Sequence, residues 1–258
     1  MSRRHLTFAC EGSTLVGTLD QGPATVGLLL VSGGNELRSG AWAGQAQLAA
    51  RIAAEGFPVF RFDRRGIGDS EGPNGGFRTS APDIAAALAA FRSACPQLQA
   101  VAGLGNCDAA AALMLARGAG LDALLLSNPW TIEDDDAAPP PEAIRDHYRR
   151  RLADPAALLR LLSGKVSLRS LFASLRAAMR PAPPPTSLAQ DMAAGIAGFP
   201  GPVAFLLAER DRTAQAFQAA WPKGDQRIRK CPDATHSFVE AHARDWLAGE
   251  VLAMLATL

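Results

Sequence analysis

The sequence predicts an α/β protein built on a mostly parallel, eight-stranded sheet with helices on both faces. Short apolar runs alternate with longer helical stretches along the 258 residues, which is the pattern of successive strand–helix units. Two of these runs, 25–31 and 202–208, are almost entirely apolar, as expected of strands buried on both faces. Another run ends in a tight turn at Cys107 and continues at once into an alanine- and leucine-rich helix.

The expected elements follow one another in a simple order. Residues 3–9 and 13–20 alternate in polarity around Glu11-Gly12 and predict an antiparallel hairpin. The other strands are expected at residues 25–31, 57–62, 101–105, 121–127, 202–208 and 226–231. Helices are expected at residues 41–55 and 82–94, after Cys107, and at 238–255. A chain of this length can bury one large core.

One long segment, 131–198, interrupts the alternation. It begins with acidic residues, continues through basic and helical stretches, and contains the proline runs 139–141 and 181–185. We expect a helical cap insertion here, within a core formed by residues 1–130 and 199–258. The basic run 149–151 favours a solvated helix face, and a polyanion or phosphate site is the alternative.

The composition argues against several classes of function. A net charge of +1 gives no reason to expect binding to nucleic acid or to a charged membrane surface. The four cysteines form no C-x-x-C pair, so neither zinc nor a redox motif is indicated, and no cofactor is expected. The chain starts without a secretory signal and has no run of the ~20 apolar residues that a membrane span needs. We therefore expect a cytoplasmic protein with free thiols.

The turn at Cys107 is the strongest functional signal. Gly105-Asn-Cys-Asp-Ala109 has the form of a nucleophile elbow, G-x-S-x-G, with cysteine in place of serine and alanine in place of the last glycine. Small residues are needed on both sides because strand and helix come into close contact there. The alternative is an ordinary buried cysteine, which is how we interpret Cys10, Cys95 and Cys231.

A cysteine nucleophile needs a base and a group that orients the base. His236 follows the last predicted strand and precedes the last helix, so it can reach the elbow across the carboxyl edge of the sheet. Asp211 follows the preceding strand and is preferred over Glu209 as its partner. The alternative for His236 is a surface loop histidine, and His5, His147 and His242 are expected to have no catalytic role.

An oxyanion site needs two backbone N–H donors. We expect one from Asp108, next to the nucleophile, and the other from Gly34 or Asn35 in the turn after the third strand. The segment 63–72 is expected to be structural, with Asp63 and Arg65 bracing the loop beside this turn.

These motifs, in this order, resemble the α/β-hydrolase superfamily over essentially the whole chain, and the resemblance implies the α/β-hydrolase fold. A cysteine elbow together with Thr235-His-Ser-Phe238 is similar to dienelactone hydrolases. Glu36 falls where those enzymes keep a glutamate that interacts with the resting cysteine. The resemblance therefore implies a gating role for Glu36, and the alternative is a surface carboxylate.

The chain resembles more closely the exosortase A system-associated hydrolase 1 family. The pieces that carry this resemblance are the residues 103–110, 126–130, 147–152, 161–166 and 209–214. The resemblance implies the company of exopolysaccharide and protein-sorting genes rather than a particular reaction. Trp130, His147 and Tyr148 are expected to line the substrate pocket.

Three functions are compatible with these residues. The leading hypothesis is a cysteine-dependent acyl hydrolase acting on a small-molecule ester, thioester or lactone. The second is an acyltransferase that uses the same three residues, Cys107, Asp211 and His236. The third is a non-catalytic binding module of an export system, which the presence of all three residues disfavours.

Overall fold

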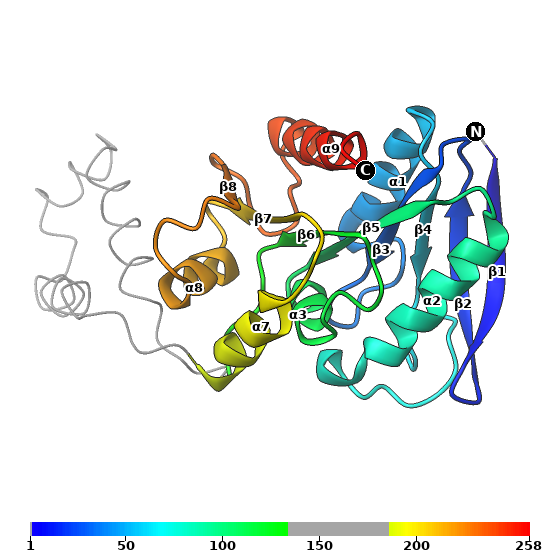
Figure 1. Cartoon of the computed structure of the whole chain (residues 1–258), viewed down its shortest axis with the longest axis horizontal. Coiled ribbons are helices and arrows are strands. Elements are labelled where there is room, and N and C mark those ends of the chain that lie inside the picture. The colour runs from blue at the N-terminus through cyan, green and yellow to red at the C-terminus, as the bar shows by residue number, and fades with distance from the viewer. Residues whose placement is uncertain (1, 134–185) are drawn as a thin grey trace, which may run out of the picture.

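The computed structural model describes residues 2–133 and 186–258 and shows one eight-stranded sheet (Figure 1). The strand order is β1-β2-β4-β3-β5-β6-β7-β8. The first two pairings, β1–β2 and β2–β4, are antiparallel, and every later pairing is parallel. The predicted fold class, mostly parallel with an antiparallel hairpin at one edge, is confirmed.

The strands lie close to their predicted positions. Their bounds are β1 Arg3–Cys10, β2 Ser13–Asp20, β3 Val26–Val31, β4 Val59–Phe62, β5 Ala100–Asn106, β6 Ala123–Ser127, β7 Val203–Ala208 and β8 Ile228–Cys231. The apolar runs become β3, β5, β6 and β7, which form the centre of the sheet. Their side chains are buried on both faces, which explains why these segments show no alternation of polarity.

Helices cover both faces of the sheet. Their bounds are α1 Gly44–Ala54, α2 Ala81–Ala94, α3 Asp108–Leu115, α7 Ser187–Ala197, α8 Arg212–Ala220 and α9 Ala241–Leu255. Helices α1 and α9 pack on one face, over Leu28, Leu30 and Leu104, and α2, α3, α7 and α8 lie on the other (Figure 1). Two turns of 3₁₀ helix, Ala41–Ala43 and Phe77–Thr79, complete the described helical structure.

Two helices start later than predicted, for reasons of backbone geometry. The helix expected from residue 41 begins as α1 only at Gly44, because Trp42 and Ala43 have φ angles of 47° and 60°. The helix expected from residue 238 begins at Ala241, because Phe238 has φ 51° and the N-cap residue Glu240 is extended, with ψ 143°. A residue with positive φ cannot be part of a right-handed helix, so each helix starts only after these residues.

The predicted cap falls largely outside the described residues. Helix α7, at the carboxyl end of the range predicted for the cap, packs closely against α3. A Cβ added at Gly195 would lie 2.1 Å from the carbonyl oxygen of Met114, so this approach requires glycine. Within residues 2–133 and 186–258, no helix is both long and apolar enough to cross a membrane.

Candidate active site

Cys107 occupies a strained turn between β5 and α3. Its φ and ψ are 63° and −125°, a region that non-glycine residues rarely adopt. Strand and helix meet closely here, since a Cβ on Gly105 would lie 2.7 Å from the carbonyl carbon of Ala109. The small residues of the elbow are therefore a steric requirement of the turn.

Backbone hydrogen bonds on both sides hold this strained residue in place. The N–H of Cys107 donates to the carbonyl of Ser127 at 2.9 Å. The carbonyl of Cys107 accepts from the N–H groups of Ala110, at 3.1 Å, and Trp130, at 3.2 Å. The end of β6 and the residues after it thus brace the elbow.

His236 and Asp211 form a close pair. His236 Nδ1 lies 3.0 Å from Asp211 Oδ2. The same carboxylate oxygen accepts the N–H of Ala214 at 3.0 Å, so Asp211 is also the N-cap of α8. The cap fixes the carboxylate and places it at the positive end of the helix dipole. Glu209, the alternative partner, has no hydrogen bond to His236.

The surroundings of His236 favour its protonated form. The hydrogen bond to Asp211 and, after it, the hydrogen bond to Cys107 raise the pKa of His236 to about 10, against the opposing effect of burial. At neutral pH His236 is therefore an imidazolium.

Two asparagines that the sequence analysis did not single out hold the backbone of His236. Asn128 Nδ2 donates to the carbonyl of His236 at 3.0 Å, and Asn106 Nδ2 donates to it at 3.3 Å. Asn128 Nδ2 also donates to Asn106 Oδ1 at 3.0 Å, and its Oδ1 accepts the N–H of Ala208 at 2.8 Å. We call Asn106 and Asn128 the asparagine clamp. The signal in the sequence for this clamp was a polar residue at the end of each of two apolar strand segments, Asn106 and Asn128.

The two candidate N–H donors in the turn after β3, those of Gly34 and Asn35, differ in whether they already have an acceptor. The N–H of Gly34 donates to Asp108 Oδ1 at 2.6 Å, so one predicted oxyanion donor is engaged by a side chain of the elbow itself. The N–H groups of Asn35 and Asp108 donate to no acceptor within the described parts of the chain. Of the two alternatives for the second donor, the geometry favours Asn35 over Gly34.

The loop after β4 braces this turn, but partly through other residues than predicted. Asp63 is fully buried and accepts the N–H of Arg38 at 2.6 Å, together with an ion pair from the Arg38 guanidinium. Arg64 donates to the carbonyl of Gly34, whereas Arg65 pairs with Asp83 and Glu11. Asp63 is therefore a brace, as predicted, but its neighbour in that role is Arg64, and Arg65 instead ties the hairpin to α2.

The remaining predicted site residues lie as follows. Trp130 is half-buried beside the elbow, where its backbone N–H donates to the carbonyl of Cys107. The carboxylate of Glu36 has no hydrogen bond to Cys107 or to any other described residue. His147 and Tyr148 lie outside the described residues.

His5 bonds to Thr18 on the edge hairpin and His242 lies on α9, both away from the elbow. Cys10, Cys95 and Cys231 are buried free thiols.

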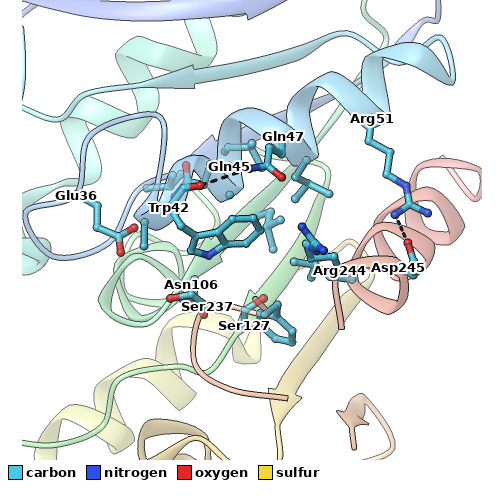
Figure 2. A pocket seen from close by; sticks show the side chains of 18 of the residues that line it. Glu36, Trp42, Gln45, Gln47, Arg51, Asn106, Ser127, Ser237, Arg244 and Asp245 are labelled. Atoms are coloured by element: carbon cyan, nitrogen blue, oxygen red, sulfur yellow. Dashed lines mark hydrogen bonds and ion pairs between the residues drawn. The ribbon is translucent and has the colours of Figure 1, made fainter. Parts of the chain in front are cut away.

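A cavity of about 390 Å³ lies between α1 and α9 (Figure 2). It is lined by Glu36, Asn106 and Ser237, each of which is next in sequence to a predicted catalytic or oxyanion residue. Cys107 and His236 themselves do not line it. Within the described ranges, no group of three or more His, Cys, Asp or Glu side chains is arranged to hold a metal ion.

Solved structures with this architecture include several hydrolases. The chain is similar to the α/β hydrolase GrgF from Penicillium sp. sh18, with 16% identity and a TM-score of 0.64 over 99% of this chain and 98% of that one. It is similar to an esterase from Pyrococcus furiosus, with 14% identity and a TM-score of 0.63 over 99% and 90% of the two chains. It is also similar to the thioesterase domain from the curacin biosynthetic pathway, with 14% identity and a TM-score of 0.55 over 98% and 100%.

At these identities the likeness establishes the fold, and the family follows from the sequence. No curated protein matches the chain at a significant level. The model of the alpha/beta hydrolase family, however, matches residues 28–250, which include the elbow, the turn after β3, Asp211 and His236. The chain belongs to the α/β hydrolase family.

Proposed function

We propose that the protein is a cysteine-dependent acyl hydrolase acting on an ester, thioester or lactone. Cys107 is the nucleophile, His236 transfers the proton, and Asp211 orients His236. The observation that carries the proposal is the 3.0 Å contact between His236 Nδ1 and Asp211, together with a strained elbow of the kind that presents a nucleophile, whose Cys107 also raises the pKa of His236. The nucleophile, acid and histidine follow one another along the chain in the order typical of the family.

The reaction follows from the roles of these three groups. The thiolate of Cys107 attacks the substrate carbonyl carbon, and the carbonyl π electrons move to its oxygen. The tetrahedral intermediate collapses to a thioester while protonated His236 gives its proton to the leaving oxygen or sulfur. A water molecule then attacks the thioester with neutral His236 as base, and the acid is released as His236 returns the proton to the thiol or keeps it beside the thiolate.

The oxyanion in both steps is bound by backbone donors. We assign this role to the N–H groups of Asp108 and Asn35, which have no protein acceptor among the described residues. Asp108 has a second role, because its carboxylate holds the N–H of Gly34 and thereby positions the turn that carries Asn35. Removing one oxyanion donor typically costs about 10²–10³ in rate.

The proposed substrates carry activated acyl groups, which suit a thiol nucleophile. An esterase and a thioesterase domain among the similar structures support ester and thioester hydrolysis. We place the reaction in the cytoplasm, where a reducing environment keeps Cys107 free. The resemblance to the exosortase-associated family supports a link to exopolysaccharide or protein-sorting systems, in which an alcohol acceptor would make the same thioester a donor for acyl transfer.

Turnover of short p-nitrophenyl esters and acyl-coenzyme A thioesters tests the proposal. We expect hydrolysis by the wild-type protein and its loss in Cys107→Ala. The matched control is Cys95→Ala, which removes a buried thiol far from the elbow and should leave the rate unchanged. Equal rates in Cys107→Ala and the wild type would contradict a cysteine mechanism. Product analysis with and without an added sugar alcohol distinguishes hydrolysis from transfer.

A further inference from the structure

We propose that the cavity between α1 and α9 is a second ligand site, which binds a small carboxylate carrying an apolar chain. The cavity lies on the α1–α9 face of the sheet, and none of Cys107, Asp211 and His236 lines it. Its volume of about 390 Å³ is within the range of small-molecule sites. The site is thus separate from the one at which the acyl group is attacked.

The walls of the cavity are mostly apolar. Leu30 and Leu104 come from the sheet, Leu48 from α1 and Leu247 from α9. The ring of Trp42 projects over the same space (Figure 2). A cavity enclosed on these sides by hydrocarbon favours a ligand whose body is also hydrocarbon.

One cation of the cavity has no counter-ion in the described structure. Arg51 pairs with Asp245 at 2.5 Å across the two helices. Arg244 forms no ion pair with any described carboxylate, and its guanidinium lies 5.5 Å from the centre of the Trp42 ring. Glu36 lies on the opposite side of that ring (Figure 2). An anionic head group is therefore favoured at Arg244 and disfavoured at the Glu36 end.

A buried hydroxyl supplies an independent indication of a ligand. Ser127 lines the cavity, is 1% exposed, and its Oγ has no hydrogen-bond partner in the described structure. Buried polar side chains without a partner are uncommon because they lose their hydration without compensation. A carboxylate oxygen of the ligand would accept the hydrogen bond that Ser127 cannot make within the protein.

The backbone under Trp42 is strained in the way typical of ligand sites. Trp42 and its neighbour Ala43 both have left-handed φ angles, which the surrounding structure must enforce. Gly44 makes room for the ring, because a Cβ at this position would lie 2.8 Å from Trp42 Cζ2. Gly44 itself has ordinary helical angles, so alanine is tolerated there by the backbone but would displace the ring.

The position of the cavity connects it to the catalytic segments. Asn106 and Ser237 line it, and they adjoin Cys107 and His236 in the chain. Asn106 also belongs to the asparagine clamp on the carbonyl of His236. A ligand in the cavity would therefore contact Asn106 and Ser237, the neighbours of the thiol and the imidazole in the chain.

Calorimetric titration of the full chain with octanoate and with octan-1-ol tests the site. We expect the wild type to bind one molar equivalent of octanoate and also to bind octanol. Arg244→Gln should weaken octanoate about fivefold, the size of a good exposed ion pair, and leave octanol unchanged. The control Arg4→Gln removes the same charge from the exposed edge strand and should change neither. Ser127→Ala should weaken octanoate.

Filling the cavity tests its location. Leu48→Trp should abolish binding of both ligands. If that variant does not fold, Gly44→Ala provides the same test by moving the Trp42 ring. Failure of the wild type to bind octanoate, or octanoate binding that survives in whichever of these variants folds, would overturn the proposal. Binding should persist in Cys107→Ala, so the result is independent of the proposed hydrolysis.

Discussion

Cys107 and His236 together show how single residues are tuned at this site. The elbow forces Cys107 into a strained backbone conformation with positive φ, and the clamp and Asp211 both hold His236. Backbone strain therefore fixes the position of Cys107, and hydrogen bonds fix the position of His236. The consequence is that substitutions which preserve volume but remove one hydrogen bond should still reduce activity strongly.

Asp211→Asn tests the orientation of His236. The substitution keeps the size of the side chain but replaces the carboxylate acceptor of the hydrogen bond that is the first cause of the raised pKa of His236, and it also removes the negative charge. We expect kcat/KM to fall by roughly 10³–10⁴-fold, as for comparable changes in other triads. The alkaline limb of the pH–rate profile should also move to lower pH, because the pKa of His236 falls. A profile with an unmoved alkaline limb would show that Asp211 does not act on His236.

Asn128→Asp tests the asparagine clamp. The change replaces the Nδ2 donor by an oxygen that faces the carbonyl of His236 and Oδ1 of Asn106. Asn128 is fully buried, so the loss should cost about 1–3 kcal/mol of unfolding free energy. Urea unfolding measures this cost. The fall in kcat should exceed any change in KM if the clamp positions His236, and a change in KM alone would contradict that role.

At the scale of the element, the β5–elbow–α3 unit depends on close contact between strand and helix. The residue pattern was sufficient to predict this unit, because strand and helix approach so closely at Gly105 that there is no room for a Cβ. The same pattern could not predict that the Asp108 side chain would engage Gly34, since that contact joins segments 74 residues apart. Nor could it locate the clamp, which becomes visible only when β5 and β6 are adjacent.

Gly105→Ala tests the steric requirement of the elbow. The new methyl would meet backbone atoms of Ala109 and Ala110 at 2.7–2.8 Å, and backbone cannot give way as a side chain can. We expect a loss of about 1–3 kcal/mol in urea unfolding, the usual cost of overpacking. The control is Gly249→Ala in α9, where no atom lies within 4 Å of the new methyl. There alanine should stabilise by roughly 0.5–1 kcal/mol. Equal effects at both positions would contradict the account.

At the scale of the whole molecule, sheet order brings distant segments to one edge. The carboxyl ends of β3, β5, β6 and β7 are adjacent, so the turn after β3, the elbow, the clamp and Asp211 meet there. The order of the motifs in the sequence predicted that the turn after β3, the elbow and Asp211 would meet, but not that the clamp would join them. The cavity behind it could not be predicted, because it results from the packing of α1 against α9 and from two left-handed residues before α1.

The raised pKa of His236 also predicts how stability depends on pH. The pKa is about 10 in the folded protein and 6.5 in the unfolded chain, so the folded state binds this proton more tightly. The contribution of His236 to stability is complete below pH 6.5 and is lost as the pH rises to 10. The difference in unfolding free energy between the wild type and His236→Gln should shrink over that range. The exposed His242→Gln serves as control, and a difference that grows with pH would contradict the raised pKa.

The most direct test of the central claim is the mass spectrum of the protein mixed with a p-nitrophenyl ester and quenched in acid. The account predicts a transient mass increase equal to one acyl group, located on Cys107 by peptide mapping and removed by neutral hydroxylamine. It also predicts that the adduct persists when His236 is replaced by glutamine but forms more slowly. Ester turnover without an adduct on Cys107, or an adduct on Cys10, Cys95 or Cys231 instead, would contradict the account.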